Sequence, residues 1–511
     1  MRIDAVRPIP VRTAITRTRI IDGTGGAEYA ADIVLEEGLI ARILPAGSFA
    51  DDGATRVIDG SGLVTCPGFI DIQGRSGPAL PVDPARLAAL TQGVTTEALV
   101  QCGSSRRTVG QDLDLLDVGQ GTNVAYLVAQ GTVRAMAMGS AEGAPTAEQL
   151  VAQVTAVADA LEQGAVGLSS GPEHAPGAHI PAAELEALCT VVAAYGGYWS
   201  PILDPNNGSV LDAVAGSIAL AAKTGVSLHL AQLSLGTGDE QGKVAELLAL
   251  LDSALDSGVN LSCDSHPYLE SPALLSSLLP AWARDGPATD VLARLNDADA
   301  VARIRAELET DGSIDWDAVR IASVGSEQLA MLVGQDIAGI AAIQSTDAIT
   351  TFVRILGADS LATSILRRTG NEENLRSIMG HRSHIGAGVG FPDAAAHPGT
   401  WGAFPRLVGH YVRDTELMDL PAMIHQLTGR PAARLSLASR GVLAAGNAAD
   451  VLVFDPDAII DMATLADPRQ PAAGIKHVFV NGVAAVSGHL PTSALAGRAL
   501  RRSAEGRTQH S

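Results

Sequence analysis

Short apolar runs rich in β-branched residues alternate with longer helical patterns through most of the chain, from about residue 66 to residue 435. Strand-like runs at residues 95–100, 123–128 and 165–168 are separated by helical patterns such as residues 146–163. This order favours parallel strands joined by crossover helices, because each helix covers the sheet while it carries the chain back. The repeat therefore predicts an α/β fold, a (β/α)8 TIM barrel.

The two ends of the chain carry strand patterns of another kind. Residues 1–64 hold three β-type segments with glycine-rich turns, and residues 437–490 hold three more. Neither end alone has enough strands to close a core. We therefore predict a small β-sandwich domain built from both termini, around a barrel at residues 65–436 that has a helical insertion near residues 285–345. Residues 491–511 would form a tail.

Composition limits the partners and the location. The chain has 511 residues, and 35 Lys and Arg against 56 Asp and Glu give a net charge of −21. This balance argues against nucleic acid or an anionic membrane as the main partner, and favours a small-molecule substrate. Four dispersed cysteines without a CxxC pair, and no targeting or membrane-spanning segment, lead us to expect a cytoplasmic protein. The oligomeric state stays open.

Residues 66–75 mark the first barrel strand. Pro67-Gly68 is a turn signal, and the apolar run that follows it predicts a buried strand. Side chains at positions i and i+2 of a strand share a face, so Gln73 and Arg75 are expected to lie side by side. The strand thus presents a polar pair at its end.

Several short segments, in the right order, resemble the zinc-dependent amidohydrolases and, within that superfamily, the N-acyl-D-amino-acid deacylases, or D-aminoacylases. The matching segments are residues 21–25, 66–71, 92–96, 167–171, 278–282, 401–406 and 448–455. The resemblance covers nearly the whole chain. It implies an amidohydrolase-type barrel with a β-sandwich domain, and it points to the positions of the family's metal ligands.

Most of those positions hold other residues in this chain. The family's His-x-His falls on Gln73 and Arg75, while its cysteine ligand is kept as Cys102. The remaining substituted positions are Gln130, Pro201, Gln232 and the acid-free segment 386–390. A zinc hydrolase needs about three protein ligands and an open position for water. We therefore expect no metal and no other cofactor.

The candidate site lies at the C-terminal ends of the barrel strands, where barrel enzymes bind substrate. Arg75 would either supply the positive charge of the lost metal or fill its space by pairing with Asp71 or Asp264. The expected catalytic residues are Arg75, Cys102, Glu173, His174, Asp264 and His266, and the expected substrate-binding residues are Gln73, Gln130, Gln232, Tyr268 and His397.

Two of these candidates have alternatives. His266 beside Asp264 is a general acid/base candidate, but Pro267 would equally turn it outward onto a loop. Cys102 would be a nucleophile if a histidine reached it, and is otherwise inherited and inert.

Other positions are more constrained by geometry. Of the neighbours Glu173 and His174, at most one can face the pocket, because adjacent residues of an extended segment point in opposite directions. His229 has an odd spacing from Gln232 on the same predicted strand, so if Gln232 faces inward, His229 faces the helix layer. His384 falls in a predicted loop of the late barrel and is expected to be solvated.

The function that we expect is a metal-independent enzyme on this scaffold that acts on a small carbonyl, amide or acyl-amino-acid-like metabolite. Acid/base chemistry would serve a cyclisation, isomerisation, elimination or amide reaction. Two alternatives stay open: a non-catalytic ligand-binding pseudoenzyme, and a zinc-dependent N-acyl-D-amino-acid deacylase-type hydrolase acting on carbon–nitrogen bonds.

Overall fold

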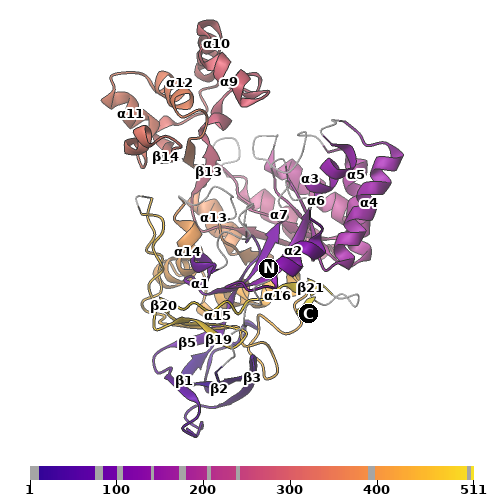
Figure 1. Cartoon of the computed structure of the whole chain (residues 1–511), viewed down its shortest axis with the longest axis vertical. Helices are drawn as coiled ribbons and strands as arrows, with labels where there is room; N and C mark the ends of the chain where they lie inside the picture. Colours follow the sequence, from indigo (N-terminus) through magenta and orange to yellow (C-terminus); the bar gives the residue numbers. More distant parts are fainter. Residues whose placement is uncertain are drawn as a thin grey trace, which may run out of the picture.

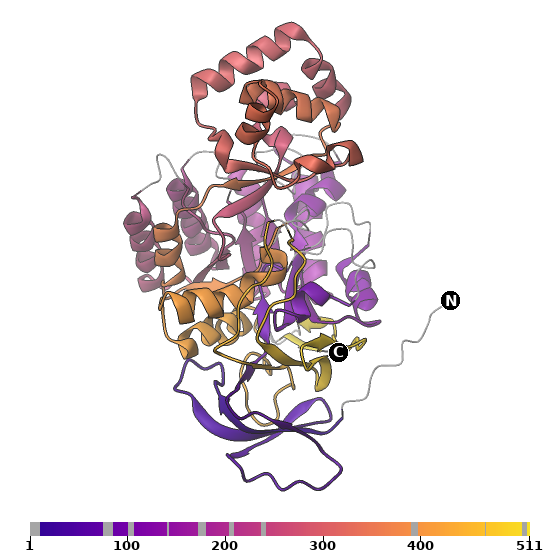
Figure 2. The same cartoon turned by 90° about the vertical axis from the view of Figure 1, so that its left-hand side faces the viewer.

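The computed structural model describes residues 11–74, 85–100, 107–139, 143–171, 180–203, 209–236, 242–389, 397–465, 467–502 and 508–510. A barrel occupies the centre, a β domain lies at one end, and a mainly helical unit lies at the other (Figures 1 and 2). The predicted fold class, an α/β barrel with a β domain drawn from both termini, is confirmed. No helix of the described residues combines the length and apolar character needed to cross a membrane.

The barrel wall is a sheet of eight parallel strands in the order β16-β12-β11-β10-β9-β8-β7-β6. These are β6 (Phe69–Asp71), β7 (Val94–Val100), β8 (Asn123–Ala129), β9 (Gly167–Ser170), β10 (Tyr198–Pro201), β11 (Ser227–Leu230), β12 (Leu261–Ser265) and β16 (His384–Gly386). At the seam between β16 and β6, the N–H of Gly388 donates to Asp71 Oδ1 at 3.1 Å. The two edges of the sheet therefore meet.

Helices cover the outside of the wall. They are α1 (Leu87–Leu90), α2 (Val109–Leu116), α3 (Gln130–Met138), α4 (Ala147–Glu162), α5 (Ala182–Ala194), α6 (Val210–Thr224), α7 (Val244–Asp256), α13 (Glu372–Met379), α14 (Gly399–Arg406), α15 (Leu420–Leu427) and α16 (Gly429–Arg434). The start of α4 is set locally, because the Thr146 side chain accepts the N–H of Gln149 and the Gln149 side chain accepts the N–H of Thr146. Such a capping box satisfies two backbone donors that a helix start leaves free.

A nine-stranded sheet joins the two ends of the chain. Its N-terminal strands are β1 (Thr13–Ile20), β2 (Tyr29–Glu36), β3 (Leu39–Pro45), β4 (Arg56–Asp59) and β5 (Val64–Pro67), and its C-terminal strands are β17 (Val451–Phe454), β18 (Ile475–Val480), β19 (Val483–Ser487) and β20 (Leu490–Pro491). β17 pairs antiparallel with β5 and so connects the two halves. β5 continues almost directly into barrel strand β6, which anchors this sheet to the barrel.

The mainly helical unit interrupts the barrel between β12 and β16. It contains β13 (Glu270–Leu274), α8 (Ala281–Arg284), α9 (Ala288–Leu295), α10 (Ala298–Asp311), β14 (Val319–Ser323), α11 (Ile337–Ile343), α12 (Ala348–Ala358) and β15 (Ser364–Arg368). β13 and β15 pair antiparallel, so they carry the chain away from the barrel and back again. The unit buries a separate apolar core that includes Phe352 and Ile365. Figure 2 shows it standing above the barrel.

The C-terminal tail packs against the barrel. The N–H of Val124 donates to the carbonyl of Arg498 at 2.8 Å, and Leu500 is buried. Leu500 opens β21 (Leu500–Arg502), which pairs with β22 (Thr508–His510). This part of the tail therefore belongs to the folded body.

A buried polar cluster fastens the β domain to the start of β8. Asp450 accepts Asn123 Nδ2 at 3.0 Å and the N–H of Asn481 at 2.8 Å, and it pairs with the Arg440 guanidinium. Asn481 Nδ2 donates to Asn123 Oδ1 at 2.8 Å, and Arg440 donates to Asn481 Oδ1 at 2.8 Å. All four residues are buried. Because their hydrogen bonds are mutual, removal of one member leaves the others unsatisfied.

We expect Asp450→Ala to lower the free energy of unfolding by about 3–5 kcal/mol, because it leaves the Arg440 charge buried and unpaired. Urea denaturation of the full chain measures this loss. The control is Glu186→Ala, which removes the exposed ion pair with Lys223 and should cost less than about 1 kcal/mol. Equal losses in the two variants would show that the cluster does not fasten the two parts.

Candidate functional site

The alternation of side chains along the strands decides which polar residues face the barrel axis. Leu228 and Leu230 of β11 and Cys263 of β12 pack in the outer core with the helices. His229 and Asp264 therefore lie on the inner face. Our assignment of His229 to the helix layer was wrong, because β11 ends at Leu230 and the alternation does not continue to Gln232, whose φ is 54°.

Asp264 is the central acceptor of a buried network on that inner face. Its Oδ2 accepts Gln73 Nε2 at 2.7 Å and lies 2.7 Å from His229 Nε2, while its Oδ1 accepts the N–H of Gln232 at 2.7 Å. His229 Nδ1 lies 2.8 Å from Ser262 Oγ. Asp264 and His229 are fully buried. The carboxylate thus fixes the ends of β6 and β11 relative to β12.

Asp71 presents a second carboxyl group at the end of β6. Its Oδ1 accepts the N–H groups of Gly388 at 3.1 Å and Gln73 at 2.9 Å. A side chain at position 388 would collide with Oδ2, so the glycine there makes room for this carboxyl group. Burial raises the pKa of Asp71 to about 7; the two N–H donors oppose this rise, and the charges of Glu97 and Asp264 add to it.

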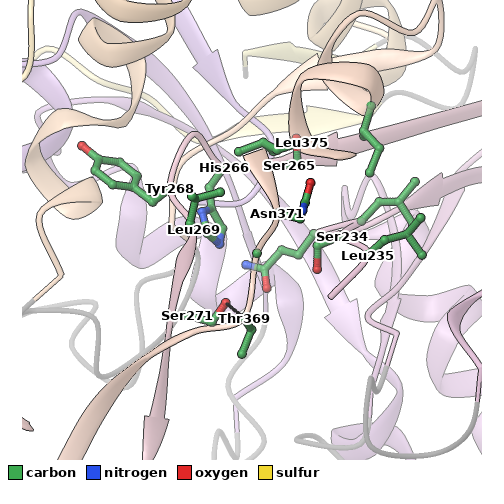
Figure 3. A pocket seen from close by; sticks show the side chains of 14 residues that line it. Ser234, Leu235, Ser265, His266, Tyr268, Leu269, Ser271, Thr369, Asn371 and Leu375 are labelled. Carbon is green, nitrogen blue, oxygen red and sulfur yellow. Dashed lines mark hydrogen bonds between the residues drawn. The ribbon is translucent and has the colours of Figure 1, made fainter. Parts of the chain in front are cut away.

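A cavity opens beside this network, at the C-terminal ends of β11 and β12 (Figure 3). The polar part of its lining comprises Gln232, Ser234, Ser265, His266, Tyr268, Ser271, Thr369 and Asn371. Two buried atoms of this lining, Gln232 Nε2 and His266 Nδ1, have no hydrogen-bond partner within the described part of the chain. Since buried polar atoms are almost always hydrogen-bonded, these two are suited to a polar ligand.

His397 and Tyr268 flank His266. The ring centroid of His397 lies 6.0 Å from that of His266 and 5.0 Å from that of Tyr268. The N–H of Gly399 donates to His397 Nδ1 at 2.9 Å, so His397 Nε2 carries the proton and donates to the Glu270 carbonyl at 3.1 Å. Burial lowers the pKa of His266 to about 4 and that of His397 to about 3. Both rings are therefore neutral at pH 7.

The structure brings part of the predicted site together. Gln232, His266 and Tyr268 line the cavity, and Gln73, Asp264 and His397 lie around it. Gln130 has a different environment, because it is fully buried and its Nε2 donates to Glu184 Oε1 of α5 at 3.0 Å. The other predicted residues, Arg75, Cys102, Glu173 and His174, lie outside the described residues.

Sequence reasoning missed His384 and Ser265. His384 begins β16 and is fully buried, so the expectation of a solvated loop residue was wrong. The short run Ser383-His384-Ile385-Gly386 carried the missed strand signal. Ser265 lies between the candidate residues Asp264 and His266, but its partner His384 is 119 residues away in the sequence, so no local pattern links them.

Comparison with known proteins places the chain in a family. A family model described as the amidohydrolase family matches residues 104–486. The chain belongs to the amidohydrolase family. Curated members similar to it include an N-acyl-D-glutamate deacylase from Alcaligenes xylosoxydans xylosoxydans, which is 32% identical over 509 residues and 95% covered in both chains. A D-aminoacylase of the same organism is 28% identical over 517 residues, with 95% of this chain and 96% of that protein covered.

A solved deacylase has a similar overall structure. The N-acyl-D-glutamate deacylase of Bordetella bronchiseptica, complexed with zinc and a phosphonate inhibitor, superposes with a TM-score of 0.80 at 29% identity, covering 96% of this chain and all of that one. The predicted resemblance to the D-aminoacylases is confirmed. The expectation of a metal-independent enzyme that acts by acid/base chemistry is contradicted, because a relative matched over 95% of this chain is an N-acyl-D-glutamate deacylase and the solved Bordetella bronchiseptica enzyme contains zinc.

The described residues do not fit a zinc ion. Zinc in proteins takes imidazole, thiolate or carboxylate ligands. At the positions where the resemblance places metal ligands, Gln73 and Gln232 carry amides, and Pro201 has no side-chain ligand atom. The Gln73 amide already donates a hydrogen bond to Asp264. No three His, Cys, Asp or Glu residues within the described ranges are arranged to hold a metal. We therefore assign no metal-dependent step to these residues.

The raised pKa of Asp71 predicts a pH-dependent stability. In the folded chain the Asp71 carboxyl group keeps its proton up to about pH 7, whereas in the unfolded chain it loses that proton at about pH 4. The stability from this group is therefore present at low pH and is lost as the pH rises through about 7. We expect the free energy of unfolding of Asp71→Asn, relative to wild type, to rise between about pH 5 and about pH 8 in urea denaturation.

The control for this experiment is Asp32→Asn. Burial raises the pKa of Asp32, but the N–H groups of Arg17, Gly47 and Phe49 outweigh it, so the net pKa is lowered. Asp32 is then ionised in both the folded and the unfolded chain between about pH 5 and about pH 8. The difference in the free energy of unfolding between Asp32→Asn and wild type should therefore not change with pH. An equally flat difference for Asp71→Asn would contradict the raised pKa.

Proposed function

We propose that this chain is a hydrolase of the N-acyl-D-amino-acid deacylase type, which cleaves the carbon–nitrogen bond of a small N-acyl amino acid. The observation that carries the proposal is the 32% identity to an N-acyl-D-glutamate deacylase across 95% of both chains. The structure solved with a phosphonate mimic of a tetrahedral intermediate supports the same reaction class, since this chain matches that one over its entire length.

The chemistry of the cavity is consistent with an amide substrate. An amide offers one carbonyl acceptor and one N–H donor. Gln232 Nε2 is an unpartnered donor suited to the carbonyl oxygen, and the neutral His266 ring supplies an unpartnered Nδ1 in the lining of the same cavity. In this proposal Gln232 and Tyr268 bind the substrate, His266 moves a proton, and Asp264 positions Gln73 and Gln232. The net charge of −21 and the dispersed cysteines favour a cytoplasmic enzyme acting on a small molecule, with no nucleic acid or membrane as partner.

The test incubates the full chain with N-acetyl-D-glutamate, N-acetyl-D-aspartate, N-acetyl-D-methionine and their L-enantiomers, and measures the released amino acid by chiral chromatography. Each reaction is run on the protein as purified, after chelation, and with added zinc, while elemental analysis counts the bound zinc. We expect release from at least one D-substrate and slower release from its L-enantiomer. No release under any of the three metal conditions would remove the proposal and favour the ligand-binding pseudoenzyme.

Gln232→Ala tests the assignment of the cavity. Loss of one hydrogen bond to the substrate should lower kcat/KM by about tenfold. Gln335→Ala is the matched control, because the amide of Gln335 caps the carbonyl of Met331 in the inserted unit. Equal kcat/KM values for the two variants would place substrate binding elsewhere.

A further inference from the structure

Ser265, the last residue of β12, begins a hydrogen-bonded chain of three buried side chains. Its Oγ lies 2.8 Å from His384 Nε2, and His384 Nδ1 lies 3.0 Å from Gln426 Oε1. Ser265 and Gln426 are each 3% exposed, and His384 is fully buried. The deacylase proposal uses none of these three residues.

The packing of the strands explains how they meet. β12 and β16 are parallel neighbours in which Cys263 lies opposite His384 and Ser265 lies opposite Gly386. Ser265 and His384 therefore point to the same, outer face, where α15 supplies Gln426. Gly386 leaves no side chain on β16 at the level of Ser265.

Gln426 fixes the positions of the protons along these hydrogen bonds. Its Nε2 donates to the Met379 carbonyl at 3.1 Å, so its Oε1 faces His384. An amide oxygen only accepts, and therefore His384 Nδ1 carries the proton. Burial lowers the pKa of His384 to about 4, so at pH 7 the ring is neutral and Nε2 has a free lone pair. The Ser265 hydroxyl must donate to Nε2, as a serine nucleophile donates to its general base.

Ser265 and His266 line the cavity at the strand ends (Figure 3), and Gln232 is part of the same lining. The unpartnered Gln232 Nε2 is a hydrogen-bond donor in that cavity. Such a donor stabilises the negative oxygen that forms when a nucleophile attacks a carbonyl. A hydroxyl with its base, and a donor for the oxyanion, thus share one small cavity.

We propose that Ser265 is the nucleophile of a second, acyl-transfer activity, with His384 as its general base, Gln426 as the residue that orients His384, and Gln232 as the donor to the carbonyl oxygen. The substrates are small acyl esters. This activity is separate from the deacylase function and does not rest on it.

Each step balances. Ser265 Oγ bonds to the acyl carbon while its proton passes to His384 Nε2, and the ester C–O bond breaks as the alcohol leaves with that proton. Water then attacks the acyl-serine, gives one proton to His384, and releases the carboxylic acid as Ser265 regains its hydrogen. The net reaction is ester plus water to acid plus alcohol.

The test treats the native full chain with a fluorophosphonate probe, which forms a P–O bond to a reactive serine as fluoride leaves. We expect peptide mass spectrometry to find the label on Ser265. The rate at which the probe labels the Ser265→Ala variant should be lower than for wild type by at least about 100-fold. The turnover of p-nitrophenyl acetate by this variant should fall as well. Ser271→Ala is the matched control, because Ser271 lines the same cavity but its hydroxyl oxygen accepts a hydrogen bond from the Thr369 hydroxyl and does not pair with a histidine.

Gln426→Glu and Gln426→Leu test whether the hydrogen bonds that link Ser265, His384 and Gln426 support catalysis or only the structure. A carboxylate against His384 Nδ1 strengthens the base, so Gln426→Glu should label about tenfold faster, and Gln426→Leu about tenfold slower. A purely structural hydrogen bond would not accelerate labelling. The proposal is overturned if the label sits on another residue, if Ser265→Ala labels as fast as wild type, or if neither Gln426 variant changes the rate while thermal unfolding shows both to be folded.

Discussion

One buried carboxylate, that of Asp264, holds the mouth of the barrel together. It accepts hydrogen bonds from Gln73 at the end of β6 and from the backbone of Gln232 after β11, and it contacts His229 on its own side of the wall. A fully buried carboxylate is stable only when donors surround it, so these segments cannot move independently. The cavity beside the network has its shape because Asp264 fixes Gln232, whose amide hydrogens remain available to a ligand.

The two proposed chemistries can share this region because adjacent residues of a strand point to opposite faces. Asp264 faces the barrel axis, whereas Ser265 faces the helix layer and meets His384 and Gln426 there. The end of β12 therefore contributes to both an inner polar network and an outer serine–histidine pair. The antiparallel strands β13 and β15 rise from the same edge, so the inserted unit is anchored beside the cavity and not on a remote loop.

The barrel and its companion sheet could be predicted because hydrophobic periodicity is a local property. Strand-like runs such as residues 123–128 appear in the structure almost where the pattern places them, as β8 does at Asn123–Ala129. Predictions of site residues were less successful where they assumed that strand alternation continues beyond the end of the strand. His229 was misassigned because the backbone of Gln232 adopts φ of 54° and breaks the alternation. The metal-independent function failed for another reason: it inferred chemistry from missing ligands, whereas similarity over the whole chain points to the deacylases.

The sequence by itself determined the family, the barrel order and the residue types at the mouth, since folding cannot turn Gln73 or Gln232 into a histidine. Only the tertiary structure decided what those residues do. Gln73 meets Asp264 across 191 positions and Ser265 meets His384 across 119, distances that no local pattern spans. The pKa of Asp71 near 7 arises from burial among several strands at once. The hydrogen-bond partners of these residues are neighbours that only the closed barrel brings together. Their pKa values depend on those neighbours and on the loss of water around each group.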